Sequence, residues 1–247
     1  MTDLAIIGGT GLTRLNGLEI ERREVMHTPY GEPSGALSFG ALYGKDVVFL
    51  PRHGYGHTIP PHMVNYRANL WALKQQGVEQ VIAVCAVGGI RKDIIPSAIV
   101  LPDQIIDYTW SRNHTFFEQD LSKVTHIDFT QPYCPQMREV LIVAAAKAGV
   151  DIIVGGTYGA SQGPRLETAA EIDRMERDGC HMVGMTGMPE AALASELDLC
   201  YAVIAVSANA AAGRGAGKIE IEEIENNLVD GMAGVRAILE QAIIATC

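Results

Sequence analysis

Residues 200–217 have the sequence CYAVIAVSANAAAGRGAG, and this stretch decides the fold class. Residues 202–207 form an apolar run with the length and composition of a strand that is buried on both faces. Asn209 follows, and small residues then lead to a long amphipathic segment. A buried strand that leads through a Gly-rich loop to a helix is typical of α/β proteins. Asn209 is either a turn residue or a polar group placed for recognition.

The same alternation recurs along the whole chain. Apolar runs predict strands at residues 4–7, 47–50, 80–87, 99–106, 151–154, 181–185 and 201–207. Amphipathic runs predict helices at residues 64–76, 135–148, 168–178, 189–197 and 220–246. Pro135 and Pro189 suit the first turns of their helices, and Gly149 suits a helix end. The pattern predicts an α/β fold with a largely parallel central sheet, and because no linker divides the chain we expect a single domain over residues 1–247.

The bulk composition excludes several classes of protein. The chain has 247 residues and a net charge of −10, which argues against a nucleic-acid binder. It begins without a basic, apolar signal peptide and has no uncharged apolar run of about 20 residues, so we expect a cytoplasmic protein without membrane partners. Its five cysteines are scattered and show neither C-x-x-C nor Cys/His spacing, so we expect free, mostly buried thiols and no metal site.

Two motifs that follow predicted strands are suited to binding an anion. Gly8-Gly9-Thr10-Gly11 can form a cradle of backbone N–H groups beside the Thr10 hydroxyl, although it lacks the dinucleotide and P-loop patterns. Arg52 and His53 follow the strand at residues 47–50, and a guanidinium fork matches phosphate oxygens. A simple tight turn and a solvated surface remain the alternatives for these two motifs.

A third motif, at residues 159–163, matches the G-x-S-x-G nucleophile elbow of serine hydrolases around Ser161. Pro164 stands where the elbow's helix begins, and the one histidine downstream, His181, follows within about twenty residues. A serine hydrolase that acts through Ser161 is therefore a minor alternative.

The remaining polar candidates are Glu167, Thr186, Glu190 and Asn209. Taken singly, each glutamate can be a helix-start carboxylate that interacts with the helix dipole. Taken together, the candidates fall into two chemical groups. Thr186 joins the anion-binding residues, whereas Glu167 and Asn209 offer a carboxylate and an amide that suit a planar heterocycle.

Several blocks resemble the trimeric purine nucleoside phosphorylases, and most of all their methylthioadenosine phosphorylase branch. The blocks are IIGGTGL (6–12), TPYGEPS (28–34), RHGYGHTIPP (52–61), VNYRANLWALK (64–74), PYCP (132–135), GPR (163–165) and MTGMPE (185–190). The resemblance implies a three-layer α/β sandwich with a central mixed sheet and a distorted barrel. It also implies a homotrimer, a pentosyltransferase activity that uses inorganic phosphate, and no cofactor.

The resemblance also implies roles for residues at matching positions. Phosphate would be held by Thr10, Arg52, His53, Thr186 and the backbone at Ala86. Met185 would pack beneath the ribose, and His126 would reach the 5′ pocket of a neighbouring subunit. Cys85 stands where the methylthioadenosine branch has a threonine on the phosphate, so one donor is weakened or missing.

The residues expected to contact the base depart from the methylthioadenosine branch. That branch has Asp-x-Asp where this chain has Asn209-Ala210-Ala211, and serine where it has Glu167. An amide can donate to O6 of a purine and accept from N7–H, and a carboxylate accepts from N1–H, a group that neutral adenine lacks. This pair therefore favours a 6-oxopurine, and Glu167 and Asn209, with His53, are the catalytic candidates.

The residues aligned with the 5′ pocket agree with the methylthio branch. Ile221 and Ile224 are apolar where ordinary purine nucleoside phosphorylases have a histidine for the 5′-hydroxyl, and an apolar pocket favours a methylthio group. Both could instead lie on the face of the terminal helix that packs against the hydrophobic core. The sequence thus predicts phosphorolysis of S-methyl-5′-thioinosine. An inosine/guanosine phosphorylase, a methylthioadenosine phosphorylase and a non-catalytic nucleoside binder remain alternatives.

Overall fold

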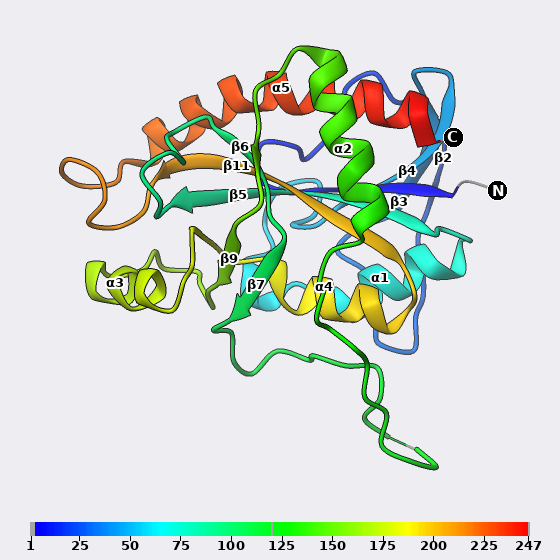
Figure 1. Cartoon of the computed structure of the whole chain (residues 1–247). Helices are drawn as coiled ribbons and strands as arrows, with labels where there is room; N and C mark the ends of the chain where they lie inside the picture. The colour runs from blue at the N-terminus through cyan, green and yellow to red at the C-terminus, as the bar shows by residue number, and fades with distance from the viewer. Residues whose placement is uncertain (1–2, 120, 247) are drawn as a thin grey trace.

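The computed structural model describes residues 3–119 and 121–246 (Figure 1). Over these residues, eleven strands form one mixed sheet, with five α-helices and one 3-10 helix (Pro61–Met63) around it. The strands are β1 (Leu4–Gly8), β2 (Glu19–Glu24), β3 (Leu37–Leu42), β4 (Lys45–Pro51), β5 (Gln80–Gly89), β6 (Ile99–Leu101), β7 (Gln104–Asp107), β8 (Ile153–Val154), β9 (Thr157–Ala160), β10 (Met182–Gly184) and β11 (Cys200–Ala210). The helices are α1 (Tyr66–Gln75), α2 (Pro135–Ala148), α3 (Ala169–Arg177), α4 (Gly187–Glu196) and α5 (Ile221–Thr246).

The sheet branches at the long inner strand β5. The first part of β5 lies between β1 and β11 and is parallel to both. Its last residues, Gly88 and Gly89, remain paired with β11 and pair on their other side with the antiparallel β10, which continues the sheet to β9 and β7. The antiparallel strands β2 and β3 extend the other edge beyond β4. The sheet is thus mixed, as the resemblance implies, and its central strands β4, β1, β5 and β11 are parallel, as the alternation of strands and helices predicts.

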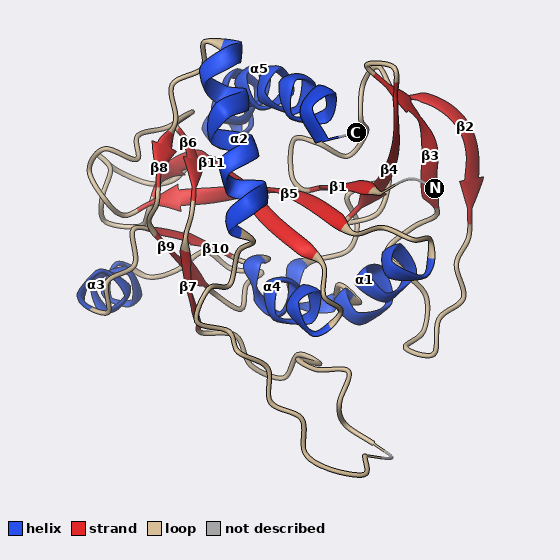
Figure 2. Ribbon diagram, turned by 45° about the vertical axis from the view of Figure 1, so that its right-hand side comes forward, coloured by secondary structure: helices blue, strands red, loops and turns tan. Residues whose placement is uncertain are grey.

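The side chains of β11 alternate between two hydrophobic cores, which explains its continuous apolar sequence. Tyr201 and Val203 belong to the core beneath α1 and α4, whereas Ala202 and Ile204 belong to the core beneath α2 and α5. The two pairs of helices cover opposite faces of the sheet, and α3 stands apart at one end (Figure 2). This arrangement is the three-layer sandwich that the sequence predicts.

Local sequence signals set the ends of several helices. Pro135 occupies the first turn of α2, and Gly149 ends it in the left-handed conformation at φ 65°. Thr168 and Glu171 form a reciprocal capping box at the start of α3, which fixes the chain next to Glu167. No helix of the described residues is long and apolar enough to cross a membrane.

Two predictions from the sequence are wrong in detail. The strand expected at residues 99–106 is two strands, β6 and β7, because Pro102 lacks an N–H for a continuous ladder. The cysteines are not all free, because Cys134 and Cys200 form a disulfide between the start of α2 and the start of β11. Cys85 and Cys180 are free and buried as expected, and Cys247 lies outside the described residues.

Candidate active site

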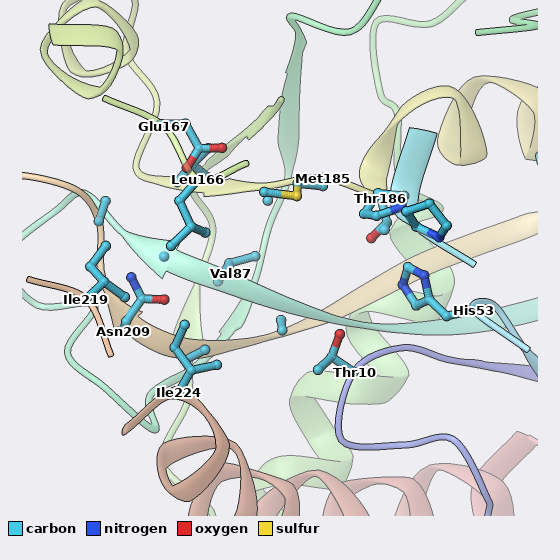
Figure 3. A pocket seen from close by; sticks show the side chains of 18 of the residues that line it. Thr10, His53, Val87, Leu166, Glu167, Met185, Thr186, Asn209, Ile219 and Ile224 are labelled. Atoms are coloured by element: carbon cyan, nitrogen blue, oxygen red, sulfur yellow. The ribbon is translucent and has the colours of Figure 1, made fainter. Parts of the chain in front are cut away.

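A cavity of about 480 Å³ opens at the carboxyl edge of the sheet. Ligands of open α/β sheets bind at this edge, because loops from several parallel strands converge there. β10 runs antiparallel to β5, and it therefore brings Met185 and Thr186 back alongside Ala86. Polar groups gather at two ends of the cavity, with Met185 and Val87 between them (Figure 3).

The first end contains Thr10, His53 and Thr186, which come from three different strand ends (Figure 3). Arg52 and Ala86 also line the cavity, so all five residues expected to bind phosphate meet there. Gly9 allows this approach, because a Cβ there would lie 2.5 Å from the Val84 carbonyl and 2.8 Å from Arg52 Nη1.

Arg52 is completely buried and its fork is already engaged. Its Nε and Nη2 each donate to one carboxylate oxygen of Glu190 at 2.7 Å, and Nη1 donates to the carbonyl of Val84 at 2.9 Å. The Tyr201 hydroxyl donates to Glu190 at 2.9 Å. Burial opposes the charge, but the carboxylate of Glu190 raises the pKa of Arg52 well above its usual value. These bonds use three of the five N–H groups of the guanidinium, and Cys85 is a further side-chain partner of Arg52.

His53 is fixed in one neutral form. Its Nδ1 lies 2.8 Å from the carbonyl oxygen of Ile59, and because a carbonyl can only accept, Nδ1 carries the proton. Burial, together with the charge of Arg52, lowers the pKa of His53 to about 4. At neutral pH the ring therefore offers its Nε2 lone pair as an acceptor, which suits a protonated oxygen of hydrogen phosphate.

His57 also lines the cavity, although it was not among the site residues expected from the sequence. Its ring lies 4.7 Å from that of His53, and its Nε2 is 3.5 Å from Thr10 Oγ1. Burial lowers its pKa. The sequence signal for His57 is its position four residues after His53, in the segment that follows the same strand.

The second end contains Glu167 and Asn209 (Figure 3). Glu167 lies in the connection from β9 to α3, and its Oε1 accepts a hydrogen bond from Ser161 Oγ. Asn209 lies where the pairing of β11 with β5 shifts register, and such a bulge re-aims a side chain. Its Nδ2 donates to the carbonyl of Ala210 at 2.7 Å, which leaves one N–H and the amide oxygen for a ligand.

Apolar side chains complete the wall near Asn209. Ile224, Ala211 and Met185 line the cavity as expected, and Ile219, which was not expected from the sequence, lies there too. Ile221 begins α5 on its outer side, 63% exposed, and is not part of the lining. His126 is also exposed outside the cavity, in the long connection between β7 and α2 that projects beyond α4 (Figure 1).

Buried Arg112 ties together the backbone segments that carry the site. Its Nη1 donates to the carbonyls of Met185 and Met188 at 2.8 and 2.6 Å, and its Nη2 donates to that of Gln162 at 2.7 Å. Nothing in the local sequence marks this residue, because its partners lie 46 to 76 positions away.

Ser161 lacks the partner that a serine nucleophile needs. Its hydroxyl donates to Glu167, and in the part of the chain that the structure describes no histidine is hydrogen-bonded to it. His181 instead accepts from the backbone N–H of Thr157. The geometry therefore gives the serine hydrolase alternative no support. The described residues also contain no group of three or more His, Cys, Asp and Glu side chains arranged to hold a metal ion.

Comparison with known proteins identifies the family. A model of the phosphorylase superfamily matches residues 3–244. The chain belongs to this superfamily. A probable S-methyl-5′-thioinosine phosphorylase from Pseudomonas syringae is 53% identical over 246 residues, with both chains fully covered. This result confirms the resemblance seen in the sequence, and with it the expectation of an enzyme.

More distant relatives point to the same family with other substrates in their names. The 6-oxopurine nucleoside phosphorylase of Pyrococcus furiosus is 46% identical, over 91% of this chain and 85% of the relative. Methylthioadenosine phosphorylase from Schistosoma mansoni in complex with adenine superimposes with a TM-score of 0.93 at 32% identity, over 99% of this chain and 91% of that one. The fold is therefore that of a nucleoside phosphorylase.

Proposed function

We propose that the protein catalyses the phosphorolysis of S-methyl-5′-thioinosine to hypoxanthine and 5-methylthioribose 1-phosphate. The observation that carries this proposal is the placement of Glu167 and Asn209 together at one end of a cavity whose other end holds the anion-binding set. The 53% identity to a probable enzyme of this specificity agrees with it.

The first step is the binding of phosphate between Thr10, His53, Arg52 and Thr186. Thr10 offers a hydroxyl donor, Arg52 its positive charge, and His53 an acceptor for the proton of hydrogen phosphate. The hydroxyl of Thr186 donates to Cys85 Sγ at 3.4 Å and would turn from it to the phosphate. The donors fix one phosphate oxygen in line with the anomeric carbon of the nucleoside, which reduces the entropic cost of the reaction.

In the chemical step, the bond from the anomeric carbon to N9 breaks and a bond to a phosphate oxygen forms. The electron pair of the broken bond passes to the purine while the sugar becomes oxocarbenium-like. The bound phosphate stabilises the positive sugar, and donors aimed at the base stabilise the developing negative charge, so the stabilisation is greatest in the transition state. The proton that hydrogen phosphate loses balances the one that hypoxanthine gains, and we assign no cofactor to the reaction.

The base is selected by hydrogen bonds that only a 6-oxopurine completes. Glu167 accepts from N1–H, while Asn209 donates to O6 and accepts from N7–H. A 6-amino base has no N1–H for Glu167, and it would pair with Asn209 only if the amide turned away from the carbonyl of Ala210. Each such mismatch costs about 1–3 kcal/mol for a buried group. Ile219 and Ile224 provide an apolar wall for the methylthio group, where a 5′-hydroxyl would lack a partner.

Product analysis with and without phosphate tests the proposed reaction. We expect hypoxanthine and 5-methylthioribose 1-phosphate from methylthioinosine only when phosphate is present. Release of free 5-methylthioribose without phosphate would indicate a hydrolase, and binding of the nucleoside without turnover would indicate a binding protein.

The homotrimer implied by the resemblance is part of the same proposal. His126 would then lie near the 5′ pocket of a neighbouring subunit, which agrees with its exposure in the projecting connection. The molar mass in solution tests the trimer, because a monomer with full activity would remove any role for His126 of a second subunit.

A further inference from the structure

Ser161 is a buried polar residue that the proposed reaction leaves without a role. It follows β9 directly, and its side chain is 7% exposed. Its backbone N–H donates to the carbonyl of Gly184 in β10 at 2.8 Å, so its position is fixed relative to the neighbouring strand. The residue belongs to the G-x-S-x-G motif, for which the structure shows no hydrolase partner.

The backbone around Ser161 is held a second time by Arg112. Nη2 of Arg112 lies 2.7 Å from the carbonyl of Gln162 and 3.3 Å from that of Ser161. Its Nε donates to the side-chain oxygen of Gln162 at 3.2 Å. A serine held from two sides can fix the direction of a hydrogen bond more strictly than one on a free loop.

The hydroxyl of Ser161 is directed at the carboxylate expected to recognise the base. Its Oγ donates to Oε1 of Glu167, while the carbonyl of Gly184 lies at 3.4 Å as a weaker second acceptor. A serine hydroxyl has a single hydrogen, and a carboxylate has two oxygens. The contact therefore fixes Glu167 through one oxygen and leaves Oε2 for a ligand.

We infer that Ser161 is a positioning residue for Glu167 and thereby strengthens the preference for a 6-oxopurine. This inference rests on the proposed function. Because Ser161 holds Oε1, the other carboxylate oxygen is directed at the base, where it can accept from N1–H of a 6-oxopurine, whereas neutral adenine has no hydrogen at N1. Ser161 thus favours a 6-oxopurine through the direction in which it holds Glu167.

The test compares Ser161→Ala with the wild type on two nucleosides. Because the hydrogen bond is to a charged group, its loss should lower kcat/KM for methylthioinosine by about 10- to 100-fold. The value for methylthioadenosine should fall much less, and KM for phosphate should not change, since Ser161 does not touch the anion end. Ser161→Thr, which retains the hydroxyl, should recover most of the loss.

A double-mutant cycle separates this role from a general effect on folding. If Ser161 acts through Glu167, Ser161→Ala should have little further effect in a Glu167→Ala background. Equal losses on both nucleosides, or fully additive losses in the cycle, would overturn the inference. An active wild-type enzyme whose preference is unchanged by Ser161→Ala would do the same while leaving the proposed function intact. Failure of the wild type to phosphorolyse methylthioinosine would instead overturn the proposed function.

Discussion

At the anion end of the cavity Arg52, His53 and Thr186 are buried, whereas at the base end both polar side chains are half-buried. Glu167 lies in the connection from β9 to α3, and Asn209 lies near the end of β11. Arg52 and Glu190 are both fully buried and fixed to each other by two hydrogen bonds. Glu167 and Asn209 are partly exposed and are held by short contacts to Ser161 and Ala210.

This difference separates stability from substrate choice. A change at the anion end disturbs a buried charge network and hence the fold, because an uncompensated charge in the core is costly. A change at the base end alters which hydrogen bonds a purine completes and leaves the core intact. We therefore expect substitutions at the anion end to lower stability, and substitutions at the base end to change substrate preference.

The largest effect is expected for Glu190→Gln at the anion end. The substitution leaves the buried guanidinium of Arg52 without its countercharge, so the free energy of unfolding should fall by about 3–5 kcal/mol. Urea unfolding measures this change. Arg165→Gln is the matched control, because it removes the exposed ion pair with Glu171 and should have little effect. Similar small changes for both variants would show that the anion end is not a structural network.

The next largest effect is a change of substrate preference from Asn209→Asp combined with Ala211→Asp. Carboxylates at these positions accept from an exocyclic amine and repel O6, so the ratio of kcat/KM for methylthioadenosine over methylthioinosine should rise about tenfold or more. Parallel rate measurements on the two nucleosides provide the ratio.

Two controls keep that experiment interpretable. Ala211 is 2% exposed, so the double variant should lose stability, and Asn209→Asp alone serves as the variant that retains the core. Asn226→Asp adds the same charge at an exposed site on α5 and should leave the ratio unchanged. A ratio unaffected by both Asn209 variants would place the determinant of base choice elsewhere.

A smaller effect is expected in the pH dependence of stability. Since folding lowers the pKa of His53 from 6.5 to about 4, the unfolded chain binds more protons between these values. The contribution of neutral His53 is therefore complete above pH 6.5 and is lost as the pH falls toward 4. Urea unfolding between pH 7.5 and pH 4.5, as chosen values, should show a flatter profile for His53→Asn, which cannot titrate but can donate to Ile59. Identical profiles would contradict the neutral, buried form of His53.

The smallest effect is expected for the ion pairs that join the loop after β11 to α3. Arg214, in the loop after β11, donates to Asp173 at 2.9 Å and to Glu176 at 2.8 Å, both on α3. Arg214→Gln should raise KM for the nucleoside by at most about fivefold, because exposed ion pairs are weak. Steady-state kinetics should show no change in KM for phosphate. A larger change for phosphate than for the nucleoside would contradict the separation of the two ends.

The sequence predicts the central elements of the fold well and its edges poorly. The helix at residues 135–148 is confirmed with its bounds, because Pro135 and Gly149 mark both ends. β2 was not predicted, because its sequence EIERRE is charged and largely exposed and shows no apolar alternation. Edge strands of this kind are stabilised by pairing with a neighbour, here β3, which the sequence does not reveal.

The site was predictable in its composition but not in its internal contacts. Four of the residues assigned to phosphate follow strand ends, which meet at one edge of a sheet, and the fifth, Ala86, lies near the end of β5. All five line one cavity. The pair of Arg52 and Glu190 joins residues 138 positions apart and has no local signal. The motif around Ser161 suggests a nucleophile, whereas its contact with Glu167 depends on the path of the chain between them.

The most direct test of the central claim is the ratio of kcat/KM for methylthioinosine to that for methylthioadenosine, measured on the wild-type enzyme with saturating phosphate. Glu167 and Asn209 each discriminate against a 6-amino base, so the account predicts a ratio of about 100 or more in favour of methylthioinosine. A faster reaction with methylthioadenosine would contradict the assignment of these two residues to a 6-oxopurine.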